Sequence, residues 1–515
     1  MICRAIAMIL FIVTLLQPGF AQDDQPTVDW QMVTSIREEG LQRSQLAATL
    51  SYMTDVLGAR YTLSNDMQRA QEWAVAELRR VGLMNTVIEP FMDYGVSWDN
   101  EYFSLHMLEP DYQPMVGYPL ANTPGTDGVQ RVPVVIADVQ TQQDRESYRG
   151  QLRGVAVLST PPASIDLTRF SRGVTRWTDE QLRELAQPAP EAAARPASAP
   201  PNPDVLSAVE RIAFFKAEGA VVVLESRSGW PGAVRGFARP GTKVDNWSRE
   251  GNLDSLPIVA VNPEHYNRMY RILQRNIPVT VEVEIRNQIG DAIEQASNVL
   301  GDIPGSDLAD ELVMLGAHFD TWHASPNASD NTSGVAVMLE AVRILKAVGV
   351  EPRRTIRVAL WAGEEQGIFG SREYVRKHFG DPNDSEVGVT PAHESFSVYF
   401  NQDYGPGQYR GIYLQGNEFA RTTFTAWAEP FRDLGMTTIS PRGVGSTDHV
   451  PFDNVGLPAF QFLQDRVGGT GGHTNLDYFD TLPLDDLRKN AVIIASFVYH
   501  AAMSNKRIPR KRMAR

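Results

Sequence analysis

Apolar and polar residues recur along this chain in two rhythms, one typical of helices and one typical of strands. Over residues 31–51 and 67–83 the apolar positions follow helical spacing. Strand-like runs come next, near 85–90 and 101–108. We therefore expect residues 22–117 to form the first part of a larger domain, opening with helices and closing with strands.

The pattern of apolar and polar residues changes between residues 118 and 290, where short β runs separated by turns replace the longer helices. The runs read VPVVIADV, GVAVLST, AVVVLES, LPIVAVN and PVTVEVEI, and one helix, AVERIAFFKAEGA, lies among them. Residues 187–203, QPAPEAAARPASAPPNP, have the proline and alanine content of a flexible surface loop. We interpret 118–290 as a separate, β-rich inserted domain.

From about residue 291 to residue 505, apolar strands alternate with helices. ELVMLGAH, TIRVALWA, SVYFNQD and LPAFQFLQD are almost continuously apolar, and VAVMLEAVRILKAVG has helical spacing. Such strands, separated by helices, predict a mostly parallel sheet covered on both faces. The fold class we expect is α/β, a three-layer sandwich around a mostly parallel mixed sheet. Ligands of such sheets collect at the carboxyl ends of the strands.

The first 21 residues have the pattern of a secretory signal. Arg4 precedes the apolar run 5–16, and Ala21 offers a small residue for cleavage. The run is too short for a membrane anchor, which needs roughly 18 apolar residues. The only cysteine, Cys3, lies inside this segment, so the mature chain would hold no disulfide. We expect a secreted or periplasmic protein without stable membrane insertion.

Composition narrows the function classes. The chain of 515 residues is 43% hydrophobic and 21% charged, which suits large buried cores. Its net charge is -14, although the last ten residues, 506–515, carry six positive side chains and no acid. A nucleic-acid-binding protein would show the opposite balance. We interpret 506–515 as a solvated, disordered basic tail, and a homodimer of the acidic body stays open.

Groups able to bind a metal stand where the predicted strands of residues 291–505 end. They are His318 after the first strand, Glu364 and Glu365 after the second, Asp403 after the third, His473 beyond the last, and Asp330 just before the helix. Each alone is more often a structural or surface residue, but their repetition at consecutive strand ends is improbable by chance. Nitrogen and oxygen ligands without cysteine suit zinc, with manganese or cobalt as substitutes.

Two zinc ions need about three protein ligands each, and one bridging carboxylate lets five side chains serve both. Asp330 is the natural bridge. Asp320 follows His318 by two residues, so in an extended chain it would point the same way and accept the second imidazole N–H. Of the adjacent Glu364 and Glu365, one can ligate while the other takes a proton from water shared by the metals.

The chain resembles a known family at several motifs. They read HFDTW, ASDNTSG, WAGEEQG, FNQDYG, STDHVPFDNVGLPAFQF and HTNLDYFD. The family is that of the zinc exopeptidases with two cooperating metals, which includes bacterial leucyl aminopeptidase, glutamate carboxypeptidase and carboxypeptidase Q. The short gap between His318 and Asp330 is most like carboxypeptidase Q. The resemblance implies a zinc exopeptidase fold with an inserted protease-associated domain, and a cis peptide bond between Asp330 and Asn331.

The resemblance also implies a role for each candidate residue. His318 and Asp403 would hold one zinc, Glu365 and His473 the other, Asp330 would bridge them, and Glu364 would be the general base that activates a metal-bridging hydroxide. Asp448 and His449 fall where the family places residues near the substrate. The alternative is that they cap the helix that starts before Val450. His323 has no matching ligand role, and we expect it to face substrate or solvent.

We therefore expect an exported peptidase that acts on dipeptides or terminal residues of short peptides, as a dipeptidase or carboxypeptidase. An aminopeptidase acting on free N-termini stays open. Recognition of a free carboxylate would need an arginine, and Arg410, Arg442 and Arg466 are all near in sequence with nothing to choose among them. A glutaminyl cyclase with one zinc, or a receptor-like scaffold without catalysis, is less favoured because the ligand set is complete.

Overall fold

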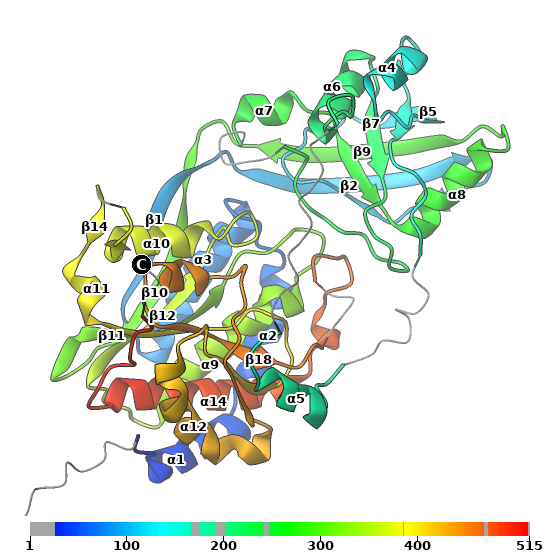
Figure 1. Ribbon diagram of the computed structural model, residues 1–515. Coiled ribbons are helices and arrows are strands. Elements are labelled where there is room, and N and C mark those ends of the chain that lie inside the picture. Colours follow the sequence, from blue (N-terminus) through cyan, green and yellow to red (C-terminus); the bar gives the residue numbers. More distant parts are fainter. Residues whose placement is uncertain are drawn as a thin grey trace, which may run out of the picture.

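The structure is a computed structural model that describes residues 26–165, 175–190, 202–241, 247–384, 386–467 and 472–512. The predicted signal, residues 1–21, and most of the predicted loop 187–203 lie outside the described residues. Two eight-stranded sheets dominate the architecture, one in each half of the ribbon in Figure 1. The mixed α/β character that the pattern predicts is therefore present.

The first sheet has the strand order β1-β10-β12-β11-β15-β18-β16-β17. Its strands are β1 (Met84–Gly95), β10 (Glu294–Ile303), β11 (Leu308–His318), β12 (Arg354–Trp361), β15 (Phe396–Asn401), β16 (Tyr409–Tyr413), β17 (Thr438–Ser440) and β18 (Ala459–Gln464). The central strands β12, β11, β15 and β18 are mutually parallel, while β10 and β16 flank them in the antiparallel sense. A parallel centre is what the continuous apolar runs predict.

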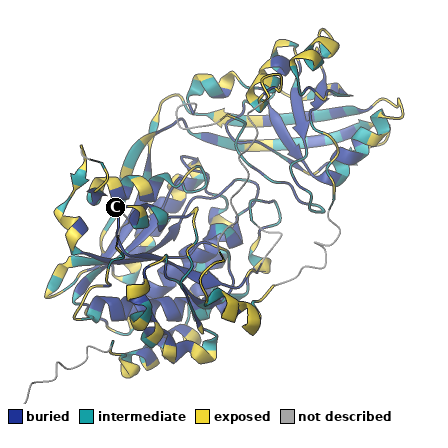
Figure 2. Ribbon diagram, viewed as in Figure 1, coloured by how far each residue is buried: buried dark blue, intermediate teal, exposed yellow. Residues whose placement is uncertain are grey.

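Helices cover both faces of this sheet, because alternate residues of a strand point to opposite sides. Val313, Leu315 and Ala317 of β11 pack into one core, and Met314 packs into another. The first face carries α1 (Trp30–Gln42), α2 (Leu46–Ser51), α3 (Asn65–Val81), α9 (Ser333–Ala347), α12 (Arg421–Ala428) and α14 (Leu484–Met503), and the second carries α10 (Phe369–His378) and α13 (Val450–Asn454). Figure 2 shows these elements buried toward the sheet and exposed outward.

The second sheet has the order β3-β2-β9-β5-β6-β7-β8-β4. Its strands are β2 (Trp98–Glu109), β3 (Gln113–Pro114), β4 (Gly117–Pro119), β5 (Gln130–Ile136), β6 (Ala156–Leu158), β7 (Val222–Glu225), β8 (Ile258–Val261) and β9 (Thr280–Ile289), and its helices include α4 (Gln142–Tyr148), α6 (Ala208–Ala217), α7 (Arg249–Leu253) and α8 (Pro263–Leu273). The sheet already begins at Trp98, ahead of the boundary expected at 118. Its assignment as an inserted protease-associated domain stays a prediction.

One helix of the 118–290 stretch, α5 (Asp179–Leu185), lies beside the first sheet instead of the second (Figure 1). Just before it, Trp177 donates its backbone N–H to Asp465 Oδ1 at 2.9 Å and its indole N–H to the Gln464 carbonyl at 2.7 Å. The Ser440 hydroxyl of β17 donates to the Leu185 carbonyl at 2.5 Å. These bonds tie the two halves of the molecule together at the end of β18.

The C-terminal residues differ from the disordered tail that their composition predicts. Ile508 is only 5% exposed. Asn417 Nδ2 donates to the Pro509 carbonyl at 2.7 Å, and Lys511 Nζ lies 2.6 Å from Asp453 Oδ1 on α13. The prediction is wrong for residues 506–512, because an apolar anchor and specific polar partners fix a segment whose charge alone favours solvent.

Within the described ranges, none of the helices combines the length and apolar character that crossing a bilayer requires.

Candidate metal centre

The candidate metal centre lies where the parallel strands of the first sheet end. His318 is the last residue of β11, and Asp403 follows β15 by two residues. The His318 Nε2 atom lies 3.3 Å from Asp330 Oδ1 and 3.4 Å from Asp403 Oδ1. Parallel neighbours deliver their carboxyl ends to one edge of a sheet, so side chains that are distant in sequence meet there.

A second group of ligating side chains forms on the other side of Asp330. His473 Nε2 lies 2.9 Å from Asp330 Oδ2 and 3.0 Å from Glu365 Oε2. The two oxygens of one carboxylate thus face two different imidazoles. His473 has a φ of 58°, a left-handed conformation that is uncommon for residues other than glycine and is found at functional sites.

Glu364 belongs to the same cluster, since ligand atoms of His318, Glu364 and Asp403 lie within 4.8 Å of one another. Burial raises the pKa of Glu364 well above its ordinary value, and burial together with the Asp330 charge raises the pKa of Glu365 to about 7. For His473, burial alone would lower the pKa, but the carboxylates around it raise that pKa to about 10. The cluster is short of positive charge, which a bound cation would supply.

The donor set fits zinc. Its imidazole-to-carboxylate separations, between 2.9 Å and 3.4 Å, are close to the roughly 3.3 Å edge of a tetrahedron with zinc bonds of about 2.0–2.1 Å. Glu365 Oε1 is buried without a hydrogen-bond partner among the described residues. An unpaired buried carboxylate oxygen calls for an explanation, and a zinc ion bound there would supply its partner.

Asp320 supports the cluster in a different way from the one predicted. The second imidazole nitrogen of His318, Nδ1, lies 2.9 Å from the backbone carbonyl of Asp320 and 4.0 Å from its carboxylate. The carboxylate instead accepts the backbone N–H groups of Glu364 at 3.1 Å and Glu365 at 3.2 Å. The expected acceptor is therefore wrong in detail, because β11 ends at His318 and the extended spacing stops there.

The loop that carries Asp330 is fixed by a residue to which the sequence assigned no role. Asp477 accepts the Ser329 backbone N–H at 2.8 Å on one oxygen and the Ser329 hydroxyl at 2.7 Å on the other. The peptide bond between Asp330 and Asn331 is cis, as the resemblance implies. Asn331 Nδ2 then donates to the Gln402 carbonyl at 2.8 Å. The motif HTNLDYFD contains Asp477, but its spacing does not separate a support from a ligand.

A fully buried arginine, Arg60, also supports the loop that carries Asp330. Its guanidinium donates to the Phe319 carbonyl at 2.8 Å and to Thr332 Oγ1 at 2.6 Å, so it joins the two ends of the loop that follows β11. Burial lowers the pKa of Arg60 to about 10. Nothing in the segment GARYTLSND marks this arginine as internal.

Asp448 and His449 are both fully buried and stand directly before α13. Ser371 Oγ donates to Asp448 Oδ1 at 2.5 Å, whereas Asp448 Oδ2 and His449 Nδ1 have no hydrogen-bond partner among the described residues. Burial raises the pKa of Asp448 to about 8. His449 occupies the N-cap position of α13 without a side-chain capping bond, so the alternative of helix capping does not account for it.

His323 is half-buried, and protein neighbours hold its ring. Its Nε2 lies 2.7 Å from the Pro119 carbonyl, and its ring centroid lies 5.0 Å from that of Trp98, whereas a position facing substrate stays a prediction. The aromatic side chains beside the cluster are instead Phe237 and Trp322, whose ring centroids lie 5.5 Å and 6.3 Å from that of His473.

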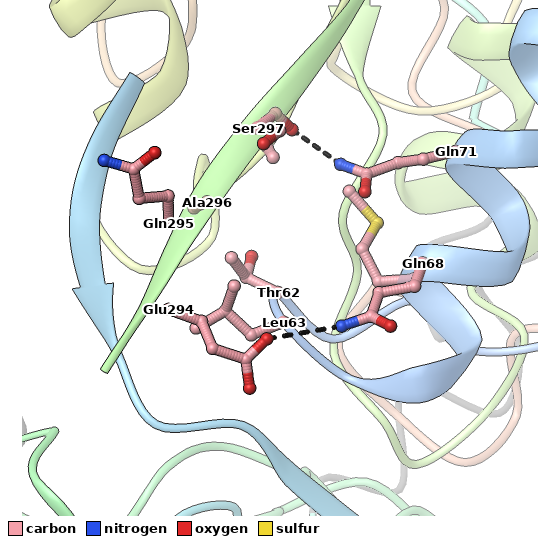
Figure 3. Close-up of a pocket in the computed structure, with 10 residues that line it drawn as sticks. Thr62, Leu63, Gln68, Gln71, Glu294, Gln295, Ala296 and Ser297 are labelled. Atoms are coloured by element: carbon pink, nitrogen blue, oxygen red, sulfur yellow. Dashed lines mark hydrogen bonds between the residues drawn. The ribbon is translucent and has the colours of Figure 1, made fainter. Parts of the chain in front are cut away.

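A small cavity of about 40 Å³ lies between α3 and β10 (Figure 3). Gln71 Nε2 donates to the Ser297 carbonyl at 2.6 Å across it, and Gln68 Nε2 donates to Glu294 Oε2 at 3.4 Å. Its volume is suited to a few waters at most, and none of the candidate ligands lines it. It is therefore separate from the metal centre.

Comparison with known proteins bears on this cluster directly. Residues 298–498 match the sequence profile of "Peptidase family M28". Carboxypeptidase Q from Homo sapiens is 23% identical over 418 residues, covering 81% of this chain and 76% of that protein. Aminopeptidase YwaD from Bacillus subtilis (strain 168) is 26% identical over 269 residues, covering 50% of this chain and 54% of that protein. The matched profile spans His318 through His473.

Solved structures show the same fold. A peptidase M28 precursor from Shewanella amazonensis SB2B superposes with a TM-score of 0.65 at 20% identity, covering 94% of this chain and 99% of that one. BSAP, a zinc aminopeptidase from Bacillus subtilis, gives a TM-score of 0.55 at 19% identity, covering 89% and 95%. As the motifs indicate, residues 298–498 match peptidase family M28, and the chain is a metallopeptidase similar to carboxypeptidase Q and to bacterial aminopeptidases.

Proposed function

We propose that this chain is an exported zinc exopeptidase that hydrolyses dipeptides or the terminal residues of short peptides. The observation that carries the proposal is the Asp330 carboxylate, whose oxygens face His318 on one side and His473 on the other. The family match and the relatives named carboxypeptidase Q and zinc aminopeptidase support zinc and peptide substrates. Export is supported by the signal pattern of residues 1–21.

In this proposal the cluster holds two zinc ions. His318 and Asp403 bind one, Glu365 and His473 bind the other, and Asp330 bridges them, as their pairwise separations support. Manganese and cobalt suit the same donors. Bound zinc polarises the scissile carbonyl and makes a water more acidic.

Glu364 serves as the general base. Its neighbour Glu365 faces His473, which leaves Glu364 beside His318 and Asp403. The Asp320 carboxylate holds the backbone of both glutamates and so fixes this division. The Glu364 carboxylate takes a proton from the attacking water and returns it to the leaving amine, a role worth about 10²–10⁴-fold.

The walls around the cluster suit a short peptide. The unpartnered atoms of Asp448 and His449 are buried, and Asp448 lies close enough to His318 for their charges to interact. Phe237 and Trp322 contact each other with ring centroids 5.1 Å apart and border His473, so they cover apolar substrate groups and exclude water. We assign these four residues to the substrate pocket.

A second candidate is an aminopeptidase that recognises free N-termini, and the relative named aminopeptidase YwaD favours it. The complete set of donors argues against a glutaminyl cyclase with one zinc and against a scaffold without catalysis. The metal content per chain separates the one-zinc alternative from the proposal.

The central test is Glu364→Gln in zinc-loaded protein, assayed on unblocked dipeptides. We expect kcat to fall by about 10²–10⁴-fold while the zinc content stays unchanged, because the ligands remain. Glu351→Gln, an exposed glutamate ahead of β12, is the matched control and should behave as wild type. Near-normal activity of Glu364→Gln would contradict the assigned role.

A further inference from the structure

Of the three arginines that could recognise a substrate carboxylate, two are already committed to protein acceptors. Arg410 Nη1 lies 3.2 Å from Asp465 Oδ1. Arg442 donates to the Glu184 carbonyl at 2.7 Å and to the Gln187 carbonyl at 3.0 Å. Arg442 therefore holds the α5 segment against the first sheet, and both guanidinium groups are already engaged with protein acceptors.

Arg466 is different. It is exposed, it follows β18 by two residues, and its guanidinium has no hydrogen-bond acceptor within the part of the chain that the structure describes. The guanidinium carbon lies 5.1 Å from the centroid of the Trp177 ring. Trp177 is itself anchored by its two hydrogen bonds to Asp465 and Gln464. A fixed aromatic face orients a stacked guanidinium while leaving its N–H edge open.

Arg466 stands at the edge of the sheet where the metal centre lies. β18 is the parallel neighbour of β15, which leads into Asp403. Gln464 at the end of β18 hydrogen-bonds the carbonyl of Gly405, and a Cβ placed on Gly405 would lie 3.6 Å from the Val467 carbonyl. The residues on either side of Arg466 therefore pack on the turn that follows the ligand Asp403.

Tyr413, the last residue of β16, lies within reach of the Arg466 charge. Burial raises the pKa of Tyr413, and the positive charges of Arg466 and Arg442 act in the opposite direction. β18 lies between β16 and β15, so Arg466 stands at the same sheet edge as the candidate ligand Asp403.

We propose that Arg466, stacked on Trp177, binds the free α-carboxylate at the C-terminus of the substrate and so makes the enzyme specific for dipeptides and other short peptides with an unblocked C-terminal end. A guanidinium offers two parallel N–H donors that match a carboxylate, and such charge-assisted pairs give both strength and orientation. The binding group would combine residues that are distant in sequence, since Trp177 comes from the 118–290 stretch. This inference rests on the proposed peptidase function.

The test compares Phe-Leu with Phe-Leu amide as substrates of zinc-loaded protein. The wild type should have a KM for the amide about 10- to 100-fold above that for the free acid, the range expected for loss of a charge-assisted hydrogen bond. Arg466→Ala should raise the KM for the free acid by the same factor, with the amide and kcat changed little. Arg466→Lys, which keeps the charge without the fork, should fall between them.

Arg286→Ala is the matched control, because Arg286 is also an exposed arginine stacked on an aromatic ring, 4.6 Å from the Tyr102 centroid, but lies on β9 of the second sheet. It should leave both KM values unchanged. Equal effects of Arg466→Ala on the KM values of the acid and the amide would overturn the inference. Hydrolysis of neither substrate by wild type would overturn the proposed function, whereas hydrolysis without discrimination would overturn the carboxylate assignment alone.

Discussion

The two sheets of this molecule share a topological feature but use it differently. Each has four consecutive parallel strands at its centre, β12, β11, β15 and β18 in the first and β5, β6, β7 and β8 in the second. The carboxyl ends of such strands are where ligands bind in open α/β sheets. The candidate metal ligands that the structure describes lie at the ends in the first sheet.

At the corresponding ends of the second sheet, the polar groups are satisfied by close neighbours. Glu225 closes β7 and pairs with Arg227, two residues further along. Asn262 follows β8 and caps α8 by accepting the backbone N–H of His265 at 3.2 Å. Thr160, beyond β6, is bonded to the Tyr266 hydroxyl. The topology thus provides the same kind of sheet edge twice. Whether an edge can bind a ligand depends on whether its polar side chains are still free of other protein partners.

The largest effect expected from this difference is loss of metal binding on changing one strand-end carboxylate. Asp330→Ala removes the oxygens that face His318 and His473. We expect zinc content to fall and kcat/KM to drop by more than the roughly 10- to 100-fold typical of changes outside the ligand shell. Zinc analysis and dipeptide hydrolysis on the same protein measure both quantities.

Glu225→Ala removes the corresponding strand-end carboxylate of the second sheet, at the end of β7. It tests whether that edge has any part in metal binding. It removes a buried carboxylate from the second sheet and should leave zinc content and kcat/KM near wild type. If Glu225→Ala lost zinc as Asp330→Ala does, the contrast between the two edges would be wrong.

A smaller effect should follow from removing the Asp320 carboxylate, which holds the backbone of Glu364 and Glu365. Asp320→Ala leaves the backbone N–H groups of Glu364 and Glu365 without their acceptor. We expect kcat/KM to fall by about 10- to 100-fold and the free energy of unfolding to fall by about 1–3 kcal/mol for each unsatisfied group. Asp320→Asn keeps one acceptor oxygen. Its kcat/KM and its free energy of unfolding should therefore lie between those of Asp320→Ala and wild type. Steady-state kinetics and urea unfolding on all three proteins test this order.

The candidate ligands could be predicted from the sequence because each follows an apolar strand that the pattern identifies. The edge of a parallel sheet then brings His318 and His473 together without any knowledge of tertiary contacts. The sequence does not predict a similar edge in the second sheet, because the strands there are short and the polar residues at their ends resemble turns.

The errors share a physical cause, which is that a local pattern does not determine which partner a polar group finds. The spacing from His318 to Asp320 indicates a shared direction only while the strand continues, and β11 ends at His318. The charge of residues 506–512 favours solvent, but Lys511 finds Asp453, and Ile508 finds an apolar site. The acceptor of His323 is the Pro119 carbonyl, a backbone atom distant in sequence.

The smallest expected effect concerns stability, and it has opposite sign in the two sheets. Burial disfavours the charged form of Glu89 on β1, but hydrogen bonds from His378 and Lys377 outweigh it and lower the pKa of Glu89 to about 2. A lowered carboxyl pKa contributes stability above the unfolded value, 4.5, that is lost as pH falls toward the folded value. Glu89→Gln should remove this contribution, which is on the order of 1 kcal/mol for a partly exposed pair.

Asp99, on β2 of the second sheet, should behave in the reverse sense. Burial raises its pKa from 3.8 to about 6, with the charges of Asp66 and Glu101 adding to the rise against the Asn65 hydrogen bond. A raised carboxyl pKa contributes stability below the unfolded value that is lost as pH rises through the folded value. The free energy of unfolding should therefore decline between about pH 4 and about pH 6 because of Asp99, and Asp99→Asn should abolish that part of the decline. Urea unfolding of wild type, Glu89→Gln and Asp99→Asn between about pH 2 and about pH 6 decides the matter. Equal pH profiles for the two variants would mean that the environments of the two acids do not differ as the structure requires.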